Sequence, residues 1–196
     1  MAQSSDRTDL PSDSDLLGLM SGGDEVAFTA LYRRHQGALY RFALQMSGKI
    51  EIAEEVTQEV FMWLMRESRH YKAERGPLIG FLYGVTRNFV LRHLERDRVY
   101  TVSMDDLDNE AMNQKVSGED VLGDLTRGER VELLRQAILS LPAPYREVVV
   151  LCDLHELDYA ETATVLGCPV GTVRSRLHRA RTLLSWKIRA SEECPA

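Results

Sequence analysis

Apolar residues recur at steps of three and four positions along several long segments of the chain, which is the spacing of one face of an α-helix. One stripe follows the start signal Gly22-Gly23-Asp24 and comprises Phe28, Leu31, His35, Leu39, Phe42 and Met46. Between the helical segments we find neither the alternation of a strand nor a repeat of fixed length. The pattern therefore predicts an all-α fold, in which His35 is packed in the core rather than bound to a metal ion.

The next segment, EIAEEVTQEVFMWLMRE, has one apolar and one acidic side when it is projected as a helix. The apolar side carries Ile52, Val56, Val60 and Trp63. The opposite side carries Glu51, Glu55, Gln58 and Met62, with Glu59 on its flank. An acidic face of this kind is often simply solvated. A methionine among carboxylates, however, also suits a docking surface for a partner that presents arginines and a small apolar patch.

A loop with the sequence YKAERGP leads into a third helical pattern, in which Leu78, Leu82, Val85 and Phe89 predict the apolar side. The other faces carry Arg87, Asn88, Arg92, His93 and Arg96, and the loop adds Tyr71, Lys72 and Arg75. Cations suit phosphates, and aromatic rings suit unstacked bases, so this mixture indicates a surface for single-stranded nucleic acid. The alternative is that the aromatic side chains are core and the basic ones merely solvated.

Charge divides the chain into segments. The whole chain of 196 residues has a net charge of −6, but residues 169–190 contain six Lys or Arg and no acid. Residues 103–124 contain seven acids and one lysine, with few large apolar residues, so we expect a flexible acidic linker there. The predicted organisation is a disordered tail (1–14), a helical domain (15–99), the linker (100–128), a second helical domain (129–190) and a short tail (191–196).

The second domain contains the pattern of a helix-turn-helix. The segment LDYAETATVLGCPVGTVRSRLHRARTLL predicts two helices separated by a turn at Gly167-Cys168, with the small Ala163 where the helices cross. On the second helix, Val170, Val173, Leu177, Ala180 and Leu184 form an apolar stripe. Arg174, Ser175, His178 and Arg179 point away from that stripe, and Arg176 and Arg181 flank them. Such a face can read base edges in the major groove and contact phosphates.

Several classes of function are disfavoured by the sequence. No apolar run is long enough to cross a bilayer, and the first residues are polar and acidic, so we expect a cytoplasmic protein without membrane insertion. Cys152, His155 and Cys168 could bind zinc, but a fourth ligand is missing, so we expect free thiols, no metal and no cofactor. We find no nucleophile–base pair or phosphate-binding glycine loop, and therefore expect no catalytic residues and no enzyme activity.

The motifs AEEVTQEVFMWL, GFLYGVTRNFVLRHLER and LPAPYREVVVLCDLHELDYAETATVLGCPVGTVRSRLHRAR together resemble the extracytoplasmic function type of bacterial RNA polymerase sigma factors, in the sigma-70 family. The resemblance covers almost everything from Asp15 to Ile188 and implies an alternative sigma factor with regions 2 and 4. Thr162, where an aliphatic residue is usual, and the run from Pro77 to Phe81 depart from the family pattern. A free-standing helix-turn-helix regulator is the alternative, although no dimerisation helix is evident.

The resemblance also implies roles for the faces described above. The helix of residues 51–66 would dock on the β′ clamp helices of core RNA polymerase through Glu55, Gln58, Glu59 and Met62. The −10 promoter element would be recognised and melted by Tyr71, Lys72, Arg75, Arg87, Asn88, Arg92 and Arg96. The −35 element would be read by Thr172, Arg174, Ser175, Arg176, His178, Arg179 and Arg181. Further partners would be the β flap and an anti-sigma factor, and the free protein would be monomeric.

Overall fold

The computed structural model describes residues 11–105 and 127–193, and every regular element in these two ranges is helical. The elements are α1 (Asp13–Ser21), α2 (Glu25–Ser47), α3 (Ile50–Glu67), η1 (Ser68–His70), η2 (Ala73–Arg75), α4 (Leu78–Asp105), α5 (Arg127–Leu139), α6 (Ala143–Val149), η3 (Val150–Leu154), α7 (Tyr159–Leu166) and α8 (Val170–Glu193). The expected all-α fold is therefore confirmed for the described part of the chain.

Helices α1 to α4 build the first predicted domain around a core in which Leu31, Leu39 and Phe42 are fully buried. The faces of α3 are as predicted, because Ile52, Val56 and Val60 are buried whereas the acidic side is exposed. On α4 the predicted apolar side is confirmed only in part. Leu78 and Leu82 are buried, whereas Val85 and Phe89 are half-buried, and the other buried side chains are Tyr83, Thr86, Val90 and His93.

Two helices extend beyond the limits predicted for the first domain. Helix α1 begins at Asp13, inside the segment expected to be a disordered tail, because Ser12 and Asp15 form a reciprocal capping box at its start. Helix α4 continues to Asp105, into the expected linker, since neither glycine nor proline follows Gly84 within it to stop the helix. Residues 1–10 and 106–126, which carry the remainder of the predicted tail and most of the linker, lie outside the described residues.

Helices α5 to α8 build the second domain, and α7 and α8 form the predicted helix-turn-helix. Asp158 caps α7 through the backbone N–H groups of Ala160 and Glu161. Gly167 ends α7 with φ of 62°, a left-handed conformation that favours glycine, and Ala163 is buried where the two helices pack. Thr162, which stands where an aliphatic residue is usual, is also buried. Its hydroxyl lies 3.3 Å from the Cys152 sulfur, so this buried polar group has a hydrogen-bond partner.

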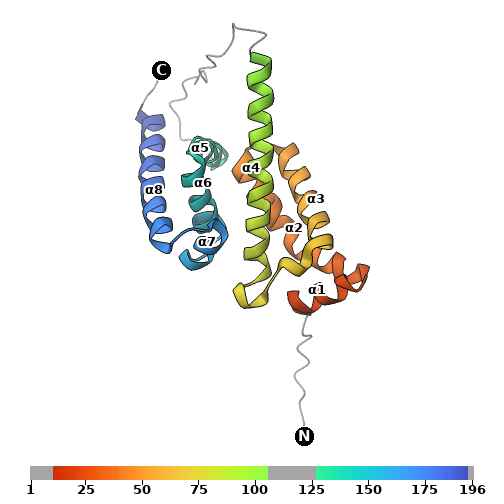
Figure 1. Cartoon of the computed structure of the whole chain (residues 1–196). Helices are drawn as coiled ribbons and strands as arrows, with labels where there is room; N and C mark the ends of the chain where they lie inside the picture. Colours follow the sequence, from red (N-terminus) through yellow and green to blue (C-terminus); the bar gives the residue numbers. More distant parts are fainter. Residues whose placement is uncertain (1–10, 106–126, 194–196) are drawn as a thin grey trace.

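The described parts of the two domains are packed against each other (Figure 1). Helix α4 lies between the α2–α3 pair on one side and α7 on the other, and α2 also contacts α5 and α6. Arg146 of α6 donates a hydrogen bond to the Met46 carbonyl at 2.6 Å. The imidazole of His155 lies between the two domains, with Nδ1 2.8 Å from the Tyr83 hydroxyl and Nε2 2.8 Å from the Gln45 side-chain oxygen.

Burial lowers the pKa of His155 from 6.5 to about 4, with a smaller contribution from the charge of Arg41. The unfolded chain takes up a proton at this histidine as the pH falls below 6.5, whereas the folded protein does so only near pH 4. His155 therefore makes the fold less stable across this interval as the pH decreases.

We predict that the urea midpoint falls less between pH 7 and pH 5 in His155→Gln than in the unchanged protein. Equal decreases of the urea midpoint in the two proteins would show that His155 does not contribute to the loss of stability at low pH.

Candidate nucleic-acid interface

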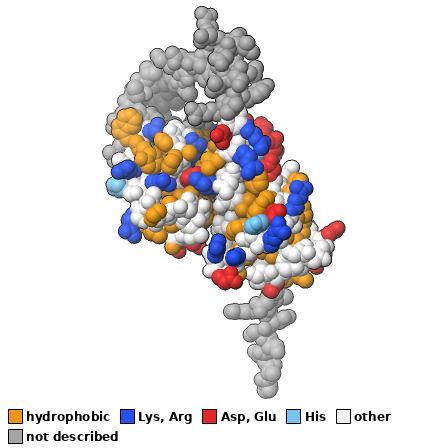
Figure 2. Space-filling view, in the orientation of Figure 1, with side chains coloured by type: hydrophobic (Ala, Val, Ile, Leu, Met, Phe, Trp, Pro, Cys, Tyr) orange, Lys and Arg blue, Asp and Glu red, His pale blue; other side chains and the backbone are white. Residues whose placement is uncertain are grey.

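Helix α8 presents a basic face that is anchored by buried apolar residues on its other side. Val173, Leu177 and Ala180 are at most 1% exposed, so the orientation of the helix is determined by packing. Arg174, Ser175, His178 and Arg179 are exposed, and Thr172 and Arg176 are half-buried. Figure 2 shows basic side chains along the outer edge of the molecule over α8. Val170 was predicted to belong to the apolar stripe but is 39% exposed.

A hollow of about 420 Å³ lies beside this face and is lined by Pro142, Pro144, Tyr145, Thr172, Ser175, Arg176 and Arg179. The Ser175 hydroxyl donates to the Thr172 carbonyl at 3.0 Å, and the Arg174 guanidinium lies 5.9 Å from the centre of the Tyr159 ring. Arg174 has no carboxylate partner among the described residues, whereas Arg181, further along the helix, pairs with Asp153. The first turns of α8 thus offer guanidinium groups that can donate to base edges or phosphates.

Arg181 is engaged within the protein. Its guanidinium donates to both oxygens of Asp153, with Nη2 2.5 Å from Oδ1 and Nε 3.1 Å from Oδ2. The pairing raises the pKa of Arg181, and the side chain remains 57% exposed. Because exposed ion pairs are worth only about 0–1 kcal/mol, a phosphate could replace Asp153 at small cost.

The loop between α3 and α4 combines packed aromatic rings with exposed cations. Tyr71 is half-buried, its ring centre lies 5.7 Å from that of Phe81, and its hydroxyl donates to the Gly76 carbonyl at 3.1 Å. Gly76 has φ of 124°, a conformation that L-amino acids rarely adopt, and it turns the chain toward α4. Lys72 and Arg75 are exposed. The aromatic rings thus help to build the core and the cations are solvated, as the second alternative predicted. Binding of single-stranded nucleic acid by this loop stays a prediction.

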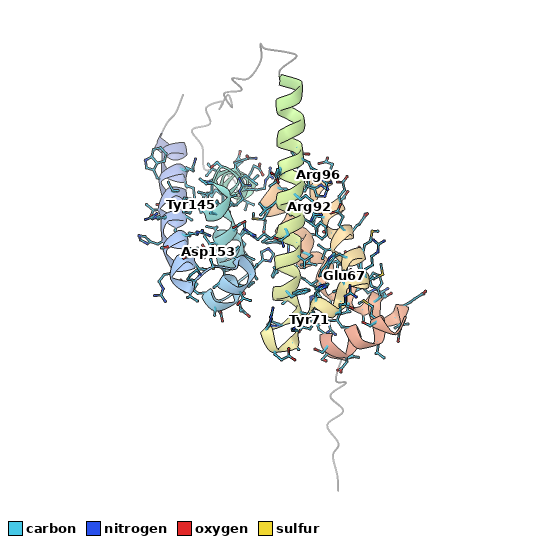
Figure 3. All side chains as sticks on the ribbon, in the orientation of Figure 1. Glu67, Tyr71, Arg92, Arg96, Tyr145 and Asp153 are labelled. Atoms are coloured by element: carbon cyan, nitrogen blue, oxygen red, sulfur yellow. The ribbon has the colours of Figure 1, made fainter. Side chains whose placement is uncertain are left out.

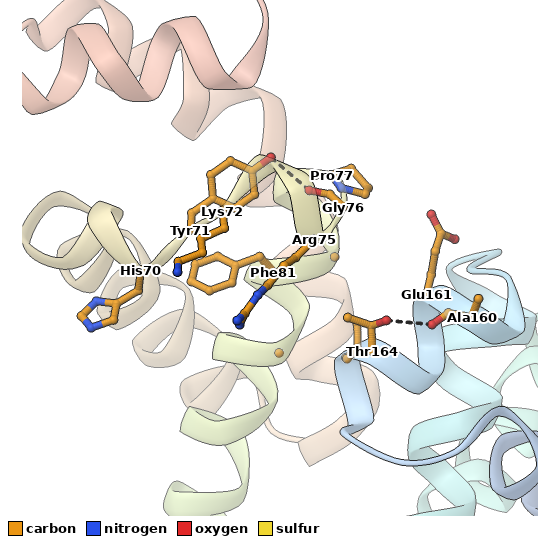
Figure 4. Close-up of a pocket in the computed structure, with 13 residues that line it drawn as sticks. His70, Tyr71, Lys72, Arg75, Gly76, Pro77, Phe81, Ala160, Glu161 and Thr164 are labelled. Atoms are coloured by element: carbon orange, nitrogen blue, oxygen red, sulfur yellow. Dashed lines mark hydrogen bonds between the residues drawn. The ribbon is translucent and has the colours of Figure 1, made fainter.

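A cavity of about 430 Å³ separates this loop from α7 (Figure 4). Tyr71, Lys72, Arg75 and Phe81 lie on one side, and Ala160, Glu161 and Thr164 lie across from them on α7. The mixture of rings and cations has the chemistry that a nucleobase and its phosphate need. In the packed arrangement the second domain closes one side of the cavity.

The predicted nucleic-acid residues on α4 have different environments. Asn88, Arg92 and Arg96 are exposed, and Arg92 lies 5.1 Å from the centre of the Phe89 ring. Figure 3 labels Arg92 and Arg96 along α4 and Tyr71 near its first turn. Arg87 is instead paired across the domain interface, with Nε 2.8 Å from Oε1 of Glu147, whose side chain is only 4% exposed. Arg87 is therefore half-buried in an ion pair, whereas Asn88, Arg92 and Arg96 are open to solvent.

The acidic side of α3 is open to solvent. Glu55, Gln58 and Met62 are exposed and Glu59 is half-buried, as the projection predicted. Figure 2 shows acidic side chains gathered where α3 begins. His93 was assigned to an exposed face of α4, but it is 9% exposed and lies against this acidic side, 3.5 Å from Glu55 and 3.3 Å from Glu59. The signal in the sequence is spacing, since His93 lies three residues after the apolar Val90 and therefore on the same side of the helix.

The residues considered for zinc have other partners. Both ring nitrogens of His155 are occupied by Tyr83 and Gln45, and the Cys152 sulfur contacts Thr162. Within residues 11–105 and 127–193 no group of three or more histidine, cysteine or acidic side chains is arranged to hold a metal ion. No described helix is both long and apolar enough to span a membrane.

Both halves of the chain match known protein families. Residues 31–99 match the sigma-70 region 2 family, and residues 131–184 match the family called sigma-70, region 4. The ECF RNA polymerase sigma-E factor of Escherichia coli is 30% identical over 186 aligned residues, and the match covers 90% of this chain and 94% of that protein. The ECF RNA polymerase sigma factor SigE of Mycolicibacterium smegmatis is 34% identical over 166 residues, but the match spans only 63% of its length.

Solved structures show the same fold. CnrH, determined in complex with the cytosolic domain of CnrY, superposes with a TM-score of 0.67 and 25% identity over 92% of this chain and 99% of that chain. The sigma factor RpoE of Bartonella quintana, determined in complex with the anti-sigma factor NepR, has a TM-score of 0.63 and 23% identity over 83% and 96% of the two chains. Together with the matches to both regions, these findings show that the chain belongs to the extracytoplasmic function sigma factors of the sigma-70 family.

Proposed function

We propose that this chain is an alternative sigma factor that binds core RNA polymerase and directs transcription initiation at specific promoters. The observation that carries the proposal is that one chain has two different surfaces with chemistry suited to nucleic acid. One is the basic face of a helix-turn-helix, and the other is an aromatic and basic loop at the start of α4. The family membership and the acidic face of α3 support it further.

The basic face of α8 is suited to duplex DNA, and we assign it to the −35 element. Arg174 and Ser175 lie in the early turns that enter the major groove, together with His178 and Arg179. Thr172, Arg176 and Arg181 lie nearer the edges of this face, where phosphates pass. Arg181 would exchange Asp153 for such a phosphate.

The loop and α4 are suited to single-stranded DNA, and we assign them to the −10 element. Lys72 and Arg75 would contact phosphates, and an unstacked base would enter the cavity beside Tyr71. Asn88, Arg92 and Arg96 extend this surface along α4. Arg87 would join it only after its ion pair with Glu147 is broken.

The acidic side of α3 would dock on the β′ clamp helices through Glu55, Gln58, Glu59 and Met62, and the second domain would contact the β flap. The proposed units are a region 2 domain near residues 15–99 and a region 4 domain near 129–190. We propose that the protein is cytoplasmic, monomeric when free, without a cofactor and without enzyme activity of its own. Because CnrH and RpoE were solved with CnrY and NepR, we also propose that an anti-sigma factor binds this chain.

Binding to both promoter elements requires the two domains to separate. The names of the elements place them about 25 base pairs apart, which is about 85 Å at about 3.4 Å per base pair. In the packed arrangement α7, the partner of the recognition helix, contacts α4 directly. The many polar groups in this interface, including Arg87, Glu147 and His155, are consistent with an interface that can open.

The proposal is tested by run-off transcription with bacterial core polymerase, with and without the protein, on templates selected for binding by the holoenzyme. We expect specific transcripts only when the protein is present. A free-standing helix-turn-helix regulator would bind DNA without producing them, and that result would favour the alternative function.

Arg174→Ala is expected to reduce binding of the holoenzyme to its preferred −35 element by about 1–3 kcal/mol and to relax the preference at one base pair. The reason is that its guanidinium lies on the exposed side of the early turns of α8. The measurement is binding across single-base variants of the element. Arg181→Ala is the matched variant, for which we expect similar weakening on every sequence. Equal losses on all sequences for Arg174→Ala would contradict a role in base recognition.

Glu147→Gln is expected to increase binding of promoter DNA by the isolated full-length protein about tenfold, because Arg87 loses its partner at the domain interface. Fluorescence anisotropy with labelled promoter DNA measures the change. Glu132→Gln is the matched control, since Glu132 pairs with Arg135 within α5 on the exposed surface. If Glu147→Gln and Glu132→Gln bind DNA equally, the packed interface does not restrict DNA binding.

A further inference from the structure

His93 occupies the end of the buried stripe of α4 and faces the acidic side of α3. Its side chain is 11% exposed, Nδ1 lies 3.5 Å from Oε2 of Glu55, and Nε2 lies 3.3 Å from Oε2 of Glu59. Glu55 and Glu59 are one helical turn apart, so their charges repel each other in the absence of a group between them. The imidazole is that group, and it comes from a different helix.

An imidazole at this position lowers the stability of the fold relative to an aliphatic side chain. The preceding residues of the stripe, Leu82, Thr86 and Val90, are buried without any group directed at a carboxylate. Nε2 of His93 is buried and has no aligned hydrogen-bond partner among the described residues, although Glu59 lies within ion-pair distance. Burial of a polar atom without a good hydrogen bond lowers stability, and an aliphatic side chain would avoid that loss. The ring therefore serves a purpose other than filling the core.

The contact leaves both carboxylates available to a partner. The ring contacts Oε2 of each carboxylate at 3.3–3.5 Å. The side chains of Glu55 and Glu59 nevertheless remain 65% and 38% exposed, so their carboxylates can accept hydrogen bonds from cations outside the protein. The ring restricts the orientation of each side chain before any partner arrives, which reduces the entropy lost when one binds.

We infer that His93 is a positioning residue for docking on core polymerase, because it holds Glu55 and Glu59 in the orientation that the partner's cations require. This inference rests on the proposed function of the α3 face. His93 also belongs to α4, the helix that carries Asn88 and Arg92, so the contact joins the docking face to the proposed −10 surface through one side chain.

The test measures the dissociation constant for core polymerase by competition with a labelled sigma factor, using the full-length chain. His93→Phe keeps a ring of similar size but removes both nitrogens, and we expect binding to weaken about tenfold because two side chains lose their restraint. His93→Gln keeps one amide donor and should bind within about threefold of the unchanged protein. In the Glu55→Gln, Glu59→Gln background, His93→Phe should change binding less than about twofold, because the carboxylates to be positioned are gone.

His35→Phe is the matched control, since His35 is also a buried histidine of the first domain and pairs with Asp13 at 2.9 Å, away from α3. It should bind polymerase normally. The inference is overturned if His93→Phe binds as tightly as His35→Phe, if His93→Gln gives no rescue, or if the effects of His93→Phe and the Glu→Gln pair simply add. The double variant Glu55→Arg, Glu59→Arg separates the two proposals. If the Glu55→Arg, Glu59→Arg variant binds core polymerase normally, the α3 face is not the docking face. If that variant binds weakly while His93→Phe binds normally, only the proposed role of His93 is contradicted.

Discussion

The packing of α4 against both halves of the chain is the constraint on which the rest of the structure depends. One side of this helix buries Leu78, Leu82 and Val90 in the first domain. Another side contacts α7 and brings Arg87 to Glu147. The apolar side fixes the helix in the first domain, whereas the side toward the second domain includes the Arg87–Glu147 ion pair and the Tyr83–His155 hydrogen bond. Under the proposed function, α4 would stay with the first domain and release the second.

Local features were predictable from the sequence because each is determined within a few residues. The glycine turn at Gly167, the acidic side of α3 and the exposed arginines of α8 all follow from helical periodicity and turn chemistry. Not every local feature was found, since the Ser12–Asp15 capping box that starts α1 was missed. Other pairings depend on distant partners. Arg87 meets Glu147 over a separation of 60 residues, Arg181 meets Asp153 over 28, and His155 meets Gln45 over 110. No spacing rule covers such pairs, so the sequence indicated exposed cations where the fold supplies carboxylates.

The surfaces needed for the proposed function are unequally available in the packed arrangement. The docking side of α3 and the early turns of α8 are exposed, whereas the cavity beside Tyr71 is partly closed by α7 and Arg87 is paired. Polymerase could therefore be bound before the −10 surface is complete. That order would favour DNA recognition by the assembled enzyme over recognition by the free chain, because opening the interface lowers the apparent affinity of the free protein for DNA.

The most direct measurement is the distance between a label on the loop between α3 and α4 and a label on the exposed side of α8, obtained by energy transfer in the free protein and in the complex with core polymerase and promoter DNA. The account predicts a short distance in the free protein, where α4 contacts α7, and a distance above about 60 Å when both promoter elements are bound. An unchanged short distance in the transcriptionally active complex would contradict it.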